Sequence, residues 1–181
     1  MTSDCSLAPV LETDRLLLRA HQLEDFPACA AMWADPAVVA HISGDPSSEE
    51  QSWARFLRYA GHWRHLGFGY WAVLSKEEGA FIGEVGLANY RRDTEPALGA
   101  TPEAGWVLTR ASHGRGYATE AVAAMLAWAD ATLDHPCTAA MVDPAHAASI
   151  RVARKVGYST QVEGRYGEHE ALFLYRERRG P

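Results

Sequence analysis

Cysteines, excess basic charge and long apolar runs are all scarce in this chain of 181 residues. The three cysteines, Cys5, Cys29 and Cys137, are odd in number and lack metal-ligand spacing. We therefore expect reduced thiols, a cytoplasmic location and no metal. The net charge of −6 argues against a nucleic-acid partner, because binding a phosphate backbone normally requires a basic face. No apolar run reaches membrane-spanning length, so we expect no membrane partner.

The amino-acid sequence also predicts neither a targeting segment nor an interdomain linker. Residues 1–4 offer no basic patch followed by an apolar core, so they do not predict a signal peptide. We find no internal repeat, low-complexity segment or interdomain linker. The length suits one domain with a sizeable core. We therefore expect a single domain over residues 1–181, with about 12–178 structured.

The apolar and turn residues alternate between strand and helix periods. Strands are expected at 15–19, 70–74, 80–87, 103–109, 138–142, 159–162 and 171–176. Helices are expected at 24–36, from the turn at 44–48 to Gly67, after the turn at 113–116, and at 147–156. The strand–helix–strand crossover in the middle makes its two strands parallel within an otherwise antiparallel sheet. The predicted fold class is therefore α/β with a mixed, largely antiparallel sheet.

A glycine-rich turn lies between the strand expected at 103–109 and the long helical pattern that follows it. It reads His113-Gly-Arg-Gly-Tyr-Ala-Thr-Glu-Ala121. Glycine lets the backbone turn tightly and approach a ligand, and the first amides of a helix are unsatisfied at the positive end of its dipole. The turn is therefore suited to a phosphate or pyrophosphate, and Arg115 adds a mobile cation. A plain helix start is the alternative.

Two common phosphate-binding folds do not fit this turn. A dinucleotide-binding fold would need Gly-x-Gly-x-x-Gly after the first strand of a repeating parallel series. A P-loop would need Gly-Lys-Ser/Thr after the turn. Neither pattern is present.

Four segments instead resemble the GNAT superfamily of acetyl-CoA-dependent N-acetyltransferases. Within it they are similar to the Rim-type branch, which acetylates N-termini of ribosomal proteins. The segments are Glu12–Arg19, Phe81–Leu87, Pro102–Ala121 and Ala148–Tyr158, and they follow the family's order over nearly the whole chain. The resemblance implies a single-domain GNAT fold. Its central parallel strand pair would splay around the cofactor, with helices on both faces of the sheet.

The resemblance also implies which residues bind acetyl-CoA. The family's pyrophosphate signature, Gln/Arg-x-x-Gly-x-Gly/Ala, falls on residues 113–118, with histidine at its first position. The amides of residues 115–119 would hold the pyrophosphate, and the backbone of residues 107–109 would pair with the pantetheine arm like an added strand. The implied cofactor-binding residues are Val107, Leu108, Thr109, His113, Gly114, Arg115, Gly116, Tyr117, Ala118, Thr119, His146 and Ser149.

Acyl transfer to an amine needs a neutral nucleophile, a polarised thioester carbonyl and a proton for the departing thiolate. In the Rim-type branch the helix after the fifth strand begins Asn-x-x-Ser, and its serine is the implied proton donor. Ser149 matches that serine, and His146 stands in place of the asparagine. The tyrosine used elsewhere in the superfamily falls on Ala153. Ser149 could equally cap the helix.

Glu84 and Glu103 are the candidate bases, because each lies in an apolar strand where an unpaired carboxylate is costly. Each should therefore face a wet cleft or a partner. Burial beside apolar neighbours would raise the pKa of such a carboxyl group toward the working range of a base. Glu103 matches the glutamate that precedes Gly-Tyr/Trp in the family's fourth strand. A salt bridge to Arg91 or Arg151 is the alternative for either residue, and a base can also act through a water chain.

Other prominent side chains have ordinary explanations. His62 and His65 are spaced three residues apart, but no third metal ligand is visible in the sequence. Arg15 flanks a strand and is expected to be structural. Four tryptophans follow helix or strand spacing and are predicted to lie in the core: Trp33, Trp53, Trp63 and Trp71.

We therefore expect an acyltransferase that moves acetyl from acetyl-CoA to a primary amine by direct attack in a ternary complex. No covalent acyl-enzyme is expected, since no cysteine lies in the matched motifs. The acceptor could be a protein N-terminal amine or a small-molecule amine, and the protein a monomer or homodimer. A catalytically idle acyl-CoA-binding module of the same fold is the alternative from another class.

Overall fold

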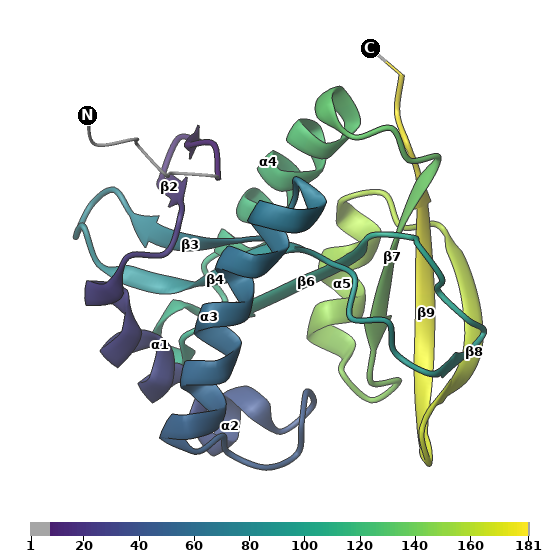
Figure 1. Ribbon diagram of the computed structural model, residues 1–181, viewed down its shortest axis with the longest axis horizontal. Helices are drawn as coiled ribbons and strands as arrows, with labels where there is room; N and C mark the ends of the chain where they lie inside the picture. The colour runs from purple at the N-terminus through teal and green to yellow at the C-terminus, as the bar shows by residue number, and fades with distance from the viewer. Residues whose placement is uncertain (1–7, 181) are drawn as a thin grey trace.

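The computed structural model describes residues 8–180 (Figure 1). Cys5 and the segment considered for a signal peptide lie outside these residues. The described strands form one nine-stranded sheet in the order β1-β2-β3-β4-β6-β7-β9-β8-β5. Every neighbouring pair is antiparallel except β6 and β7. The structure confirms the predicted α/β class and the parallel pair within a largely antiparallel sheet.

The secondary-structure elements have the following bounds. The strands are β1 (Leu11–Glu12), β2 (Leu16–Arg19), β3 (Tyr70–Ser75), β4 (Phe81–Ala88), β5 (Thr94–Glu95), β6 (Glu103–Leu108), β7 (Cys137–Val142), β8 (Thr160–Tyr166) and β9 (His169–Glu177). The helices are α1 (Phe26–Trp33), α2 (Pro36–Val39), α3 (Glu49–Leu66), α4 (Tyr117–Thr132) and α5 (Ala147–Lys155). Two 3₁₀ turns, η1 (Leu23–Asp25) and η2 (Arg110–Ser112), precede α1 and follow β6.

Helices cover both faces of the sheet, and alternation along the strands decides which residue faces which layer. Val85 of β4 packs in one core cluster with Met125 of α4. Val107 of β6 packs in a second cluster with residues of α1 and α3. Glu84 lies opposite Val107 in the β4–β6 pairing, and Glu103 is an even number of residues from Val107. Both glutamates therefore lie on the same face of the sheet as Val107, the face covered by α1 and α3.

Local signals explain the bounds of α3. The Ser48 side chain accepts a hydrogen bond from the Gln51 amide, and the Gln51 side chain accepts one from the Ser48 amide. This reciprocal capping begins the helix. Gly67 ends it in the left-handed conformation, with φ of 73°, which glycine adopts without a steric cost. The serine cap and the glycine stop agree with the sequence prediction.

Several local predictions were wrong. The first helix ends at Trp33, near Pro36 as predicted, but the short helix α2 that Pro36 begins was not expected; Asp35 caps its Ala37 amide at 2.8 Å, and proline suits the first helical position. The two-residue strands β1 and β5 were not predicted, because so short a segment has no detectable period. Trp53 is 38% exposed and lies outside the core. Among the described residues, no helix combines the length and apolar composition needed to cross a bilayer.

Candidate active site

The parallel strands β6 and β7 pair only where they begin. Their register joins Glu103 to Ala139, and the Ala139 amide donates to the Pro102 carbonyl at 3.0 Å. On its other side, β6 pairs with β4 along its whole length, from Glu103 to Leu108. The edge of β6 that faces β7 is therefore unpaired with that strand beyond Glu103. This is the splay of the central pair that the resemblance implied.

The backbone of β6 alternates between β4 and the unpaired edge. The Thr109 amide donates a hydrogen bond to the carbonyl of Ile82 in β4, at 2.9 Å, so this amide is not available to a ligand. The Leu108 carbonyl points the other way, and it accepts a hydrogen bond from His113 Nε2 at 2.9 Å. Of the three residues expected to pair with a pantetheine arm, Leu108 is thus the one whose carbonyl faces the unpaired edge.

The turn between β6 and α4 depends on two glycines. Gly114 and Gly116 have φ of 74° and 82°, in the left-handed region that other residues rarely adopt. Gly116 precedes the first turn of α4, and no side chain caps it. Within residues 8–180, the amides of Tyr117, Ala118 and Thr119 donate no hydrogen bond. Unpaired amides at the positive end of a 16-residue helix form a site for an anion.

Arg15 holds this turn from the far end of the chain. Its guanidinium donates to the Arg115 carbonyl at 3.0 Å, forms an ion pair with Glu120 at 2.6 Å, and lies 4.6 Å from the centre of the Tyr117 ring. Arg115 lies over the same ring at 4.8 Å and is 3.7 Å from Glu77. The sequence identified Arg15 as structural but gave no signal that it meets the glycine turn.

Ser149 lies in the first turn of α5 and is 9% exposed. Its hydroxyl forms no hydrogen bond within residues 8–180, and no side-chain cap begins α5. The helix-cap alternative for Ser149 was therefore wrong. Ala153, one turn later, is fully buried.

His146 precedes α5 and stacks on His41, with ring centres 4.8 Å apart. His41 in turn hydrogen-bonds Asp143 through Nδ1 at 2.7 Å. Burial lowers the pKa of His146, and positive charge on His41 and His113 would lower it further, while Asp143 opposes this shift. His146 thus faces the α2 side of the protein and lies within electrostatic range of the histidine of the glycine turn.

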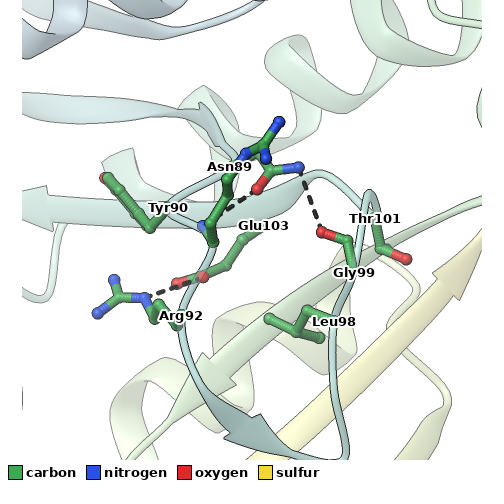
Figure 2. Close-up of a pocket in the computed structure, with 8 residues that line it drawn as sticks. Asn89, Tyr90, Arg92, Leu98, Gly99, Thr101 and Glu103 are labelled. Atoms are coloured by element: carbon green, nitrogen blue, oxygen red, sulfur yellow. Dashed lines mark hydrogen bonds and ion pairs between the residues drawn. The ribbon is translucent and has the colours of Figure 1, made fainter.

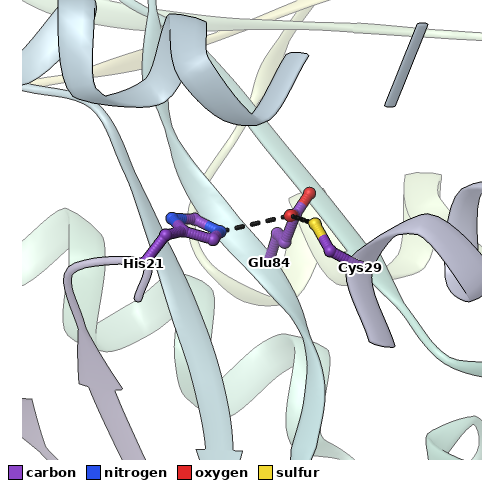
Figure 3. A group of neighbouring side chains, drawn as sticks. All are labelled: His21, Cys29 and Glu84. Carbon is purple, nitrogen blue, oxygen red and sulfur yellow. Dashed lines mark hydrogen bonds and ion pairs between the residues drawn. The ribbon is translucent and has the colours of Figure 1, made fainter. Parts of the chain in front are cut away.

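Glu84 is fully buried, and the side chains of His21 and Cys29 point at its carboxylate (Figure 3). His21 Nε2 donates to Oε1 at 3.1 Å, and the Cys29 thiol donates to the same oxygen. The Tyr59 hydroxyl and the Trp33 indole donate to Oε2 at 2.7 and 3.0 Å. Burial alone would raise the pKa of Glu84, but these donors outweigh it and lower the pKa. The predicted raised pKa and the arginine partner were therefore wrong for Glu84.

Glu103 has a different environment at the start of β6 (Figure 2). Its carboxylate pairs with Arg92 Nε at 3.1 Å; the predicted arginine partner was right in type but one residue off from Arg91. Burial raises the pKa of Glu103, and Arg92 offsets only part of this shift. A small cavity of about 10 Å³ adjoins the carboxylate, close to the space of one water. It is lined by Asn89, Tyr90, Arg91, Arg92, Leu98, Gly99, Thr101 and Glu103.

The sequence matches known acetyltransferases along most of its length. Residues 15–159 match the family model described as an acetyltransferase (GNAT) domain. This chain belongs to the GNAT acetyltransferase family. It is 29% identical over 149 residues to the uncharacterised protein YkkB of Bacillus subtilis, covering 81% of this chain and 83% of that protein. Because it belongs to this family, the protein described here is an N-acetyltransferase, which is a kind of acyltransferase.

Solved structures agree with this family. An acetyltransferase from Agrobacterium tumefaciens superposes with a TM-score of 0.80 and 29% identity, covering 94% of this chain and 95% of the other. RimL, a ribosomal L7/L12 acetyltransferase in complex with coenzyme A, superposes with a TM-score of 0.74 over 93% of this chain and 98% of its own. At 13% identity the second match shows the shared fold alone.

Proposed function

We propose that the protein transfers the acetyl group of acetyl-CoA to a primary amine by direct attack in a ternary complex. One observation carries the proposal. Two left-handed glycines leave unpaired amides at the start of α4, next to the edge of β6 that β7 leaves unpaired. The first feature suits a pyrophosphate and the second suits an extended arm with amide groups.

In this proposal, the amides of residues 115–119 bind the pyrophosphate and Arg115 screens its charge. The Leu108 backbone pairs with the pantetheine arm. The His113 side chain now contacts the Leu108 carbonyl. When the arm binds, this side chain moves aside or stays beside the arm. His146 and Ser149, at the start of α5, bound the same opening from the β7 side. Acetyl-CoA supplies an activated acyl group, and the protein's task is to place it and to move protons.

We propose Glu103 as the base that takes the proton of the acceptor amine. Its pKa is raised by burial, which suits a group that must accept a proton near neutral pH. The adjoining cavity has room for about one water, through which the proton can reach the carboxylate. Glu84 is a weaker candidate, because all its hydrogen-bonding directions point at protein donors and its side chain is fully buried.

We propose Ser149 as the acid that protonates the departing thiolate. Its hydroxyl is free of hydrogen bonds within residues 8–180 and precedes buried Ala153 by one helical turn, on the same face of α5. Glu103 begins β6, and Ser149 lies in α5, the helix that follows β7; in this proposal the acyl group lies between them. Direct transfer needs no nucleophilic residue, and none is assigned.

The acceptor is proposed to be a protein N-terminal amine or a small-molecule amine. A direct test measures thiol release from acetyl-CoA against a panel of N-terminal peptides and small amines. If the protein is an acetyltransferase, thiol will be released in the presence of at least one amine of this panel. Binding of acetyl-CoA without thiol release across the panel would favour the idle acyl-CoA-binding module instead.

A binding experiment tests the phosphate site separately. Gly114→Val should weaken coenzyme A binding strongly, because the side chain disfavours the left-handed turn that exposes the amides. Gly167→Val is the matched control, since Gly167 also has a positive φ, of 60°, and a β-carbon added there would meet nothing within 4 Å. Calorimetry should show weak binding for the first variant and unchanged binding for the second. Equal affinities in the two folded variants would refute the phosphate assignment.

A further inference from the structure

A second group of polar side chains meets beneath α1 and α3, and it comes from three separate segments (Figure 3). His21 follows β2, Cys29 belongs to α1, and Glu84 belongs to β4. One ligand atom from each lies within 4.8 Å of the other two. The side chain of His21 is 6% exposed and that of Glu84 is fully buried. Imidazole, thiol and carboxylate are therefore held together away from solvent.

The two oxygens of Glu84 have different partners. Oε2 accepts hydrogen bonds from the Tyr59 hydroxyl and the Trp33 indole, at 2.7 and 3.0 Å. Oε1 instead faces His21 Nε2 and Cys29 Sγ. Outer hydrogen bonds of this kind fix the orientation of a metal-ligating carboxylate. Tyr59 and Trp33 thus hold the carboxylate so that Oε1 points at the other two candidate ligands.

The charge of this group also favours a cation. Among residues 8–180, no lysine or arginine forms an ion pair with Glu84. The Cys29 thiol donates a hydrogen bond to Glu84 Oε1, so the sulfur keeps its proton when no cation is present. A divalent ion bound by one thiolate, one carboxylate and one neutral imidazole would form a group without net charge. Such a group places no net charge in the core, where an uncompensated charge is costly.

We propose that His21 Nε2, Cys29 Sγ and Glu84 Oε1 bind one divalent transition-metal ion of the zinc class. Nitrogen, sulfur and oxygen ligands together are typical of zinc sites, and three protein ligands leave a fourth position for water. With bonds of about 2.0–2.3 Å, tetrahedral ligand atoms lie about 3.3–3.7 Å apart. The three ligand atoms lie within 4.8 Å of one another; the two hydrogen bonds of Oε1 are shorter than this spacing, so Oε1 must move away from both partners when the metal enters.

The binding step exchanges protons for the metal and involves no oxidation. Three coordinate bonds form, the S–H bond of Cys29 breaks, and its proton goes to solvent. The ring proton of His21 moves from Nε2 to Nδ1 as Nε2 binds the metal. The hydrogen bond to Glu84 Oε1 now keeps the proton on Nε2, whereas Nδ1 has no hydrogen-bond partner in the described part of the chain and can carry the proton once the metal replaces that bond. The expectation of no metal rested on spacing along the sequence, which cannot reveal ligands from such distant segments.

Cobalt(II) titration tests the site without using enzyme activity. The full-length protein is incubated with Co²⁺ to equilibrium, and the near-ultraviolet thiolate-to-cobalt charge-transfer band is recorded. The expected result is a band that saturates at one Co²⁺ per chain and disappears when Zn²⁺ is added. Cys29→Ser should abolish the band. Cys137→Ser, which changes the other described cysteine, should keep it.

A second variant guards against misfolding of the first. His21→Asn keeps the thiol and should weaken Co²⁺ binding at least about tenfold, which corresponds to about 1.4 kcal/mol. Zn²⁺ should also raise the melting temperature of the wild type and of Cys137→Ser, but not that of His21→Asn. No band in the wild type, or a band that survives Cys29→Ser and is lost in Cys137→Ser, would overturn the proposal.

Discussion

Glu84 and Glu103 lie on the same face of the sheet, in neighbouring strands, and both are buried. Glu84 receives four hydrogen bonds from side chains of α1, α3 and the segment after β2. Glu103 pairs with one arginine from the loop after β4 and borders a small cavity. The pKa of Glu84 is consequently lowered, whereas that of Glu103 is raised. Burial alone therefore does not make a carboxylate a base; the number of donors around it decides.

The surroundings of Glu84 and Glu103 also differ in how freely they can move. Three of the four donors of Glu84 come from the helices α1 and α3, and Cys29 and Trp33 belong to the core cluster beneath these helices. Arg92, the partner of Glu103, comes from a loop and also lies over the rings of Tyr90 and Tyr166, at 4.4 and 5.1 Å. An arginine on a loop can move when an acceptor binds, and loops commonly carry such functional contacts. The following predictions test this division between the two glutamates.

Glu103→Gln should have the largest effect. Loss of a general base typically costs about 10²–10⁴-fold in turnover, and Glu84→Gln is the matched control. The rate of the wild type should rise with pH as Glu103 loses its proton. Because burial raises its pKa, this rise should occur at higher pH than for an ordinary glutamate. Steady-state rates across pH will show whether Glu103→Gln removes this ionisation. An unchanged rate and profile would exclude Glu103 as the base.

Ser149→Ala should have the next largest effect, because it removes the acid rather than the base. We expect turnover to fall by about 10²-fold, the low end for a general acid, since a thiolate is a fair leaving group. The affinity for acetyl-CoA should change little if the hydroxyl acts mainly in the transition state. Ser149→Thr keeps the hydroxyl and should recover activity. A parallel loss of cofactor affinity would instead identify Ser149 as a binding contact.

Glu84→Gln should affect stability more than catalysis. The amide group of glutamine places N–H donors against the donors that now face the carboxylate, and leaving buried donors unsatisfied costs about 1–3 kcal/mol each. Thermal and urea unfolding should therefore show a loss of this order. Turnover per folded molecule should change by less than about tenfold. A larger catalytic defect in a stably folded variant would make Glu84 a candidate base again.

Arg92→Met should produce the smallest effect, a shift in pH dependence. Arg92 lowers the pKa of Glu103, so its removal raises that pKa further. The rising limb of the rate–pH profile should move to higher pH, with the plateau at high pH largely retained. Arg91→Met is the control, since Arg91 forms no ion pair with Glu103 among the described residues. If both variants give the wild-type profile, Arg92 does not tune the base.

The sequence predicts well those features that neighbouring residues determine. The glycine turn, the cap of α3 at Ser48 and the stop at Gly67 each depend on a few consecutive residues. The parallel pair follows from the order of the elements. These features account for most of the fold and for the proposed phosphate site.

The sequence predicts poorly those features that distant segments create. The donors of Glu84 lie between 25 and 63 positions away from it, so their arrangement depends on how α1 and α3 pack. The choice of Arg92 over Arg91 depends on one loop conformation: Arg91 has φ of 49°, and the Asn89 side chain accepts its amide hydrogen at 3.1 Å. Only the folded loop shows which arginine reaches Glu103.

The incomplete pairing of β6 and β7 has a consequence for self-association. A strand edge with free N–H and C=O groups is a template for another strand, and proteins usually protect such edges. Here the unpaired edge of β6 lies inside a sheet and ends where Glu103 meets Ala139, so a long strand from a second molecule cannot run past it. The ring of His113 also occupies the Leu108 carbonyl. The protein can thus keep one strand edge free for a narrow ligand without offering a site for aggregation.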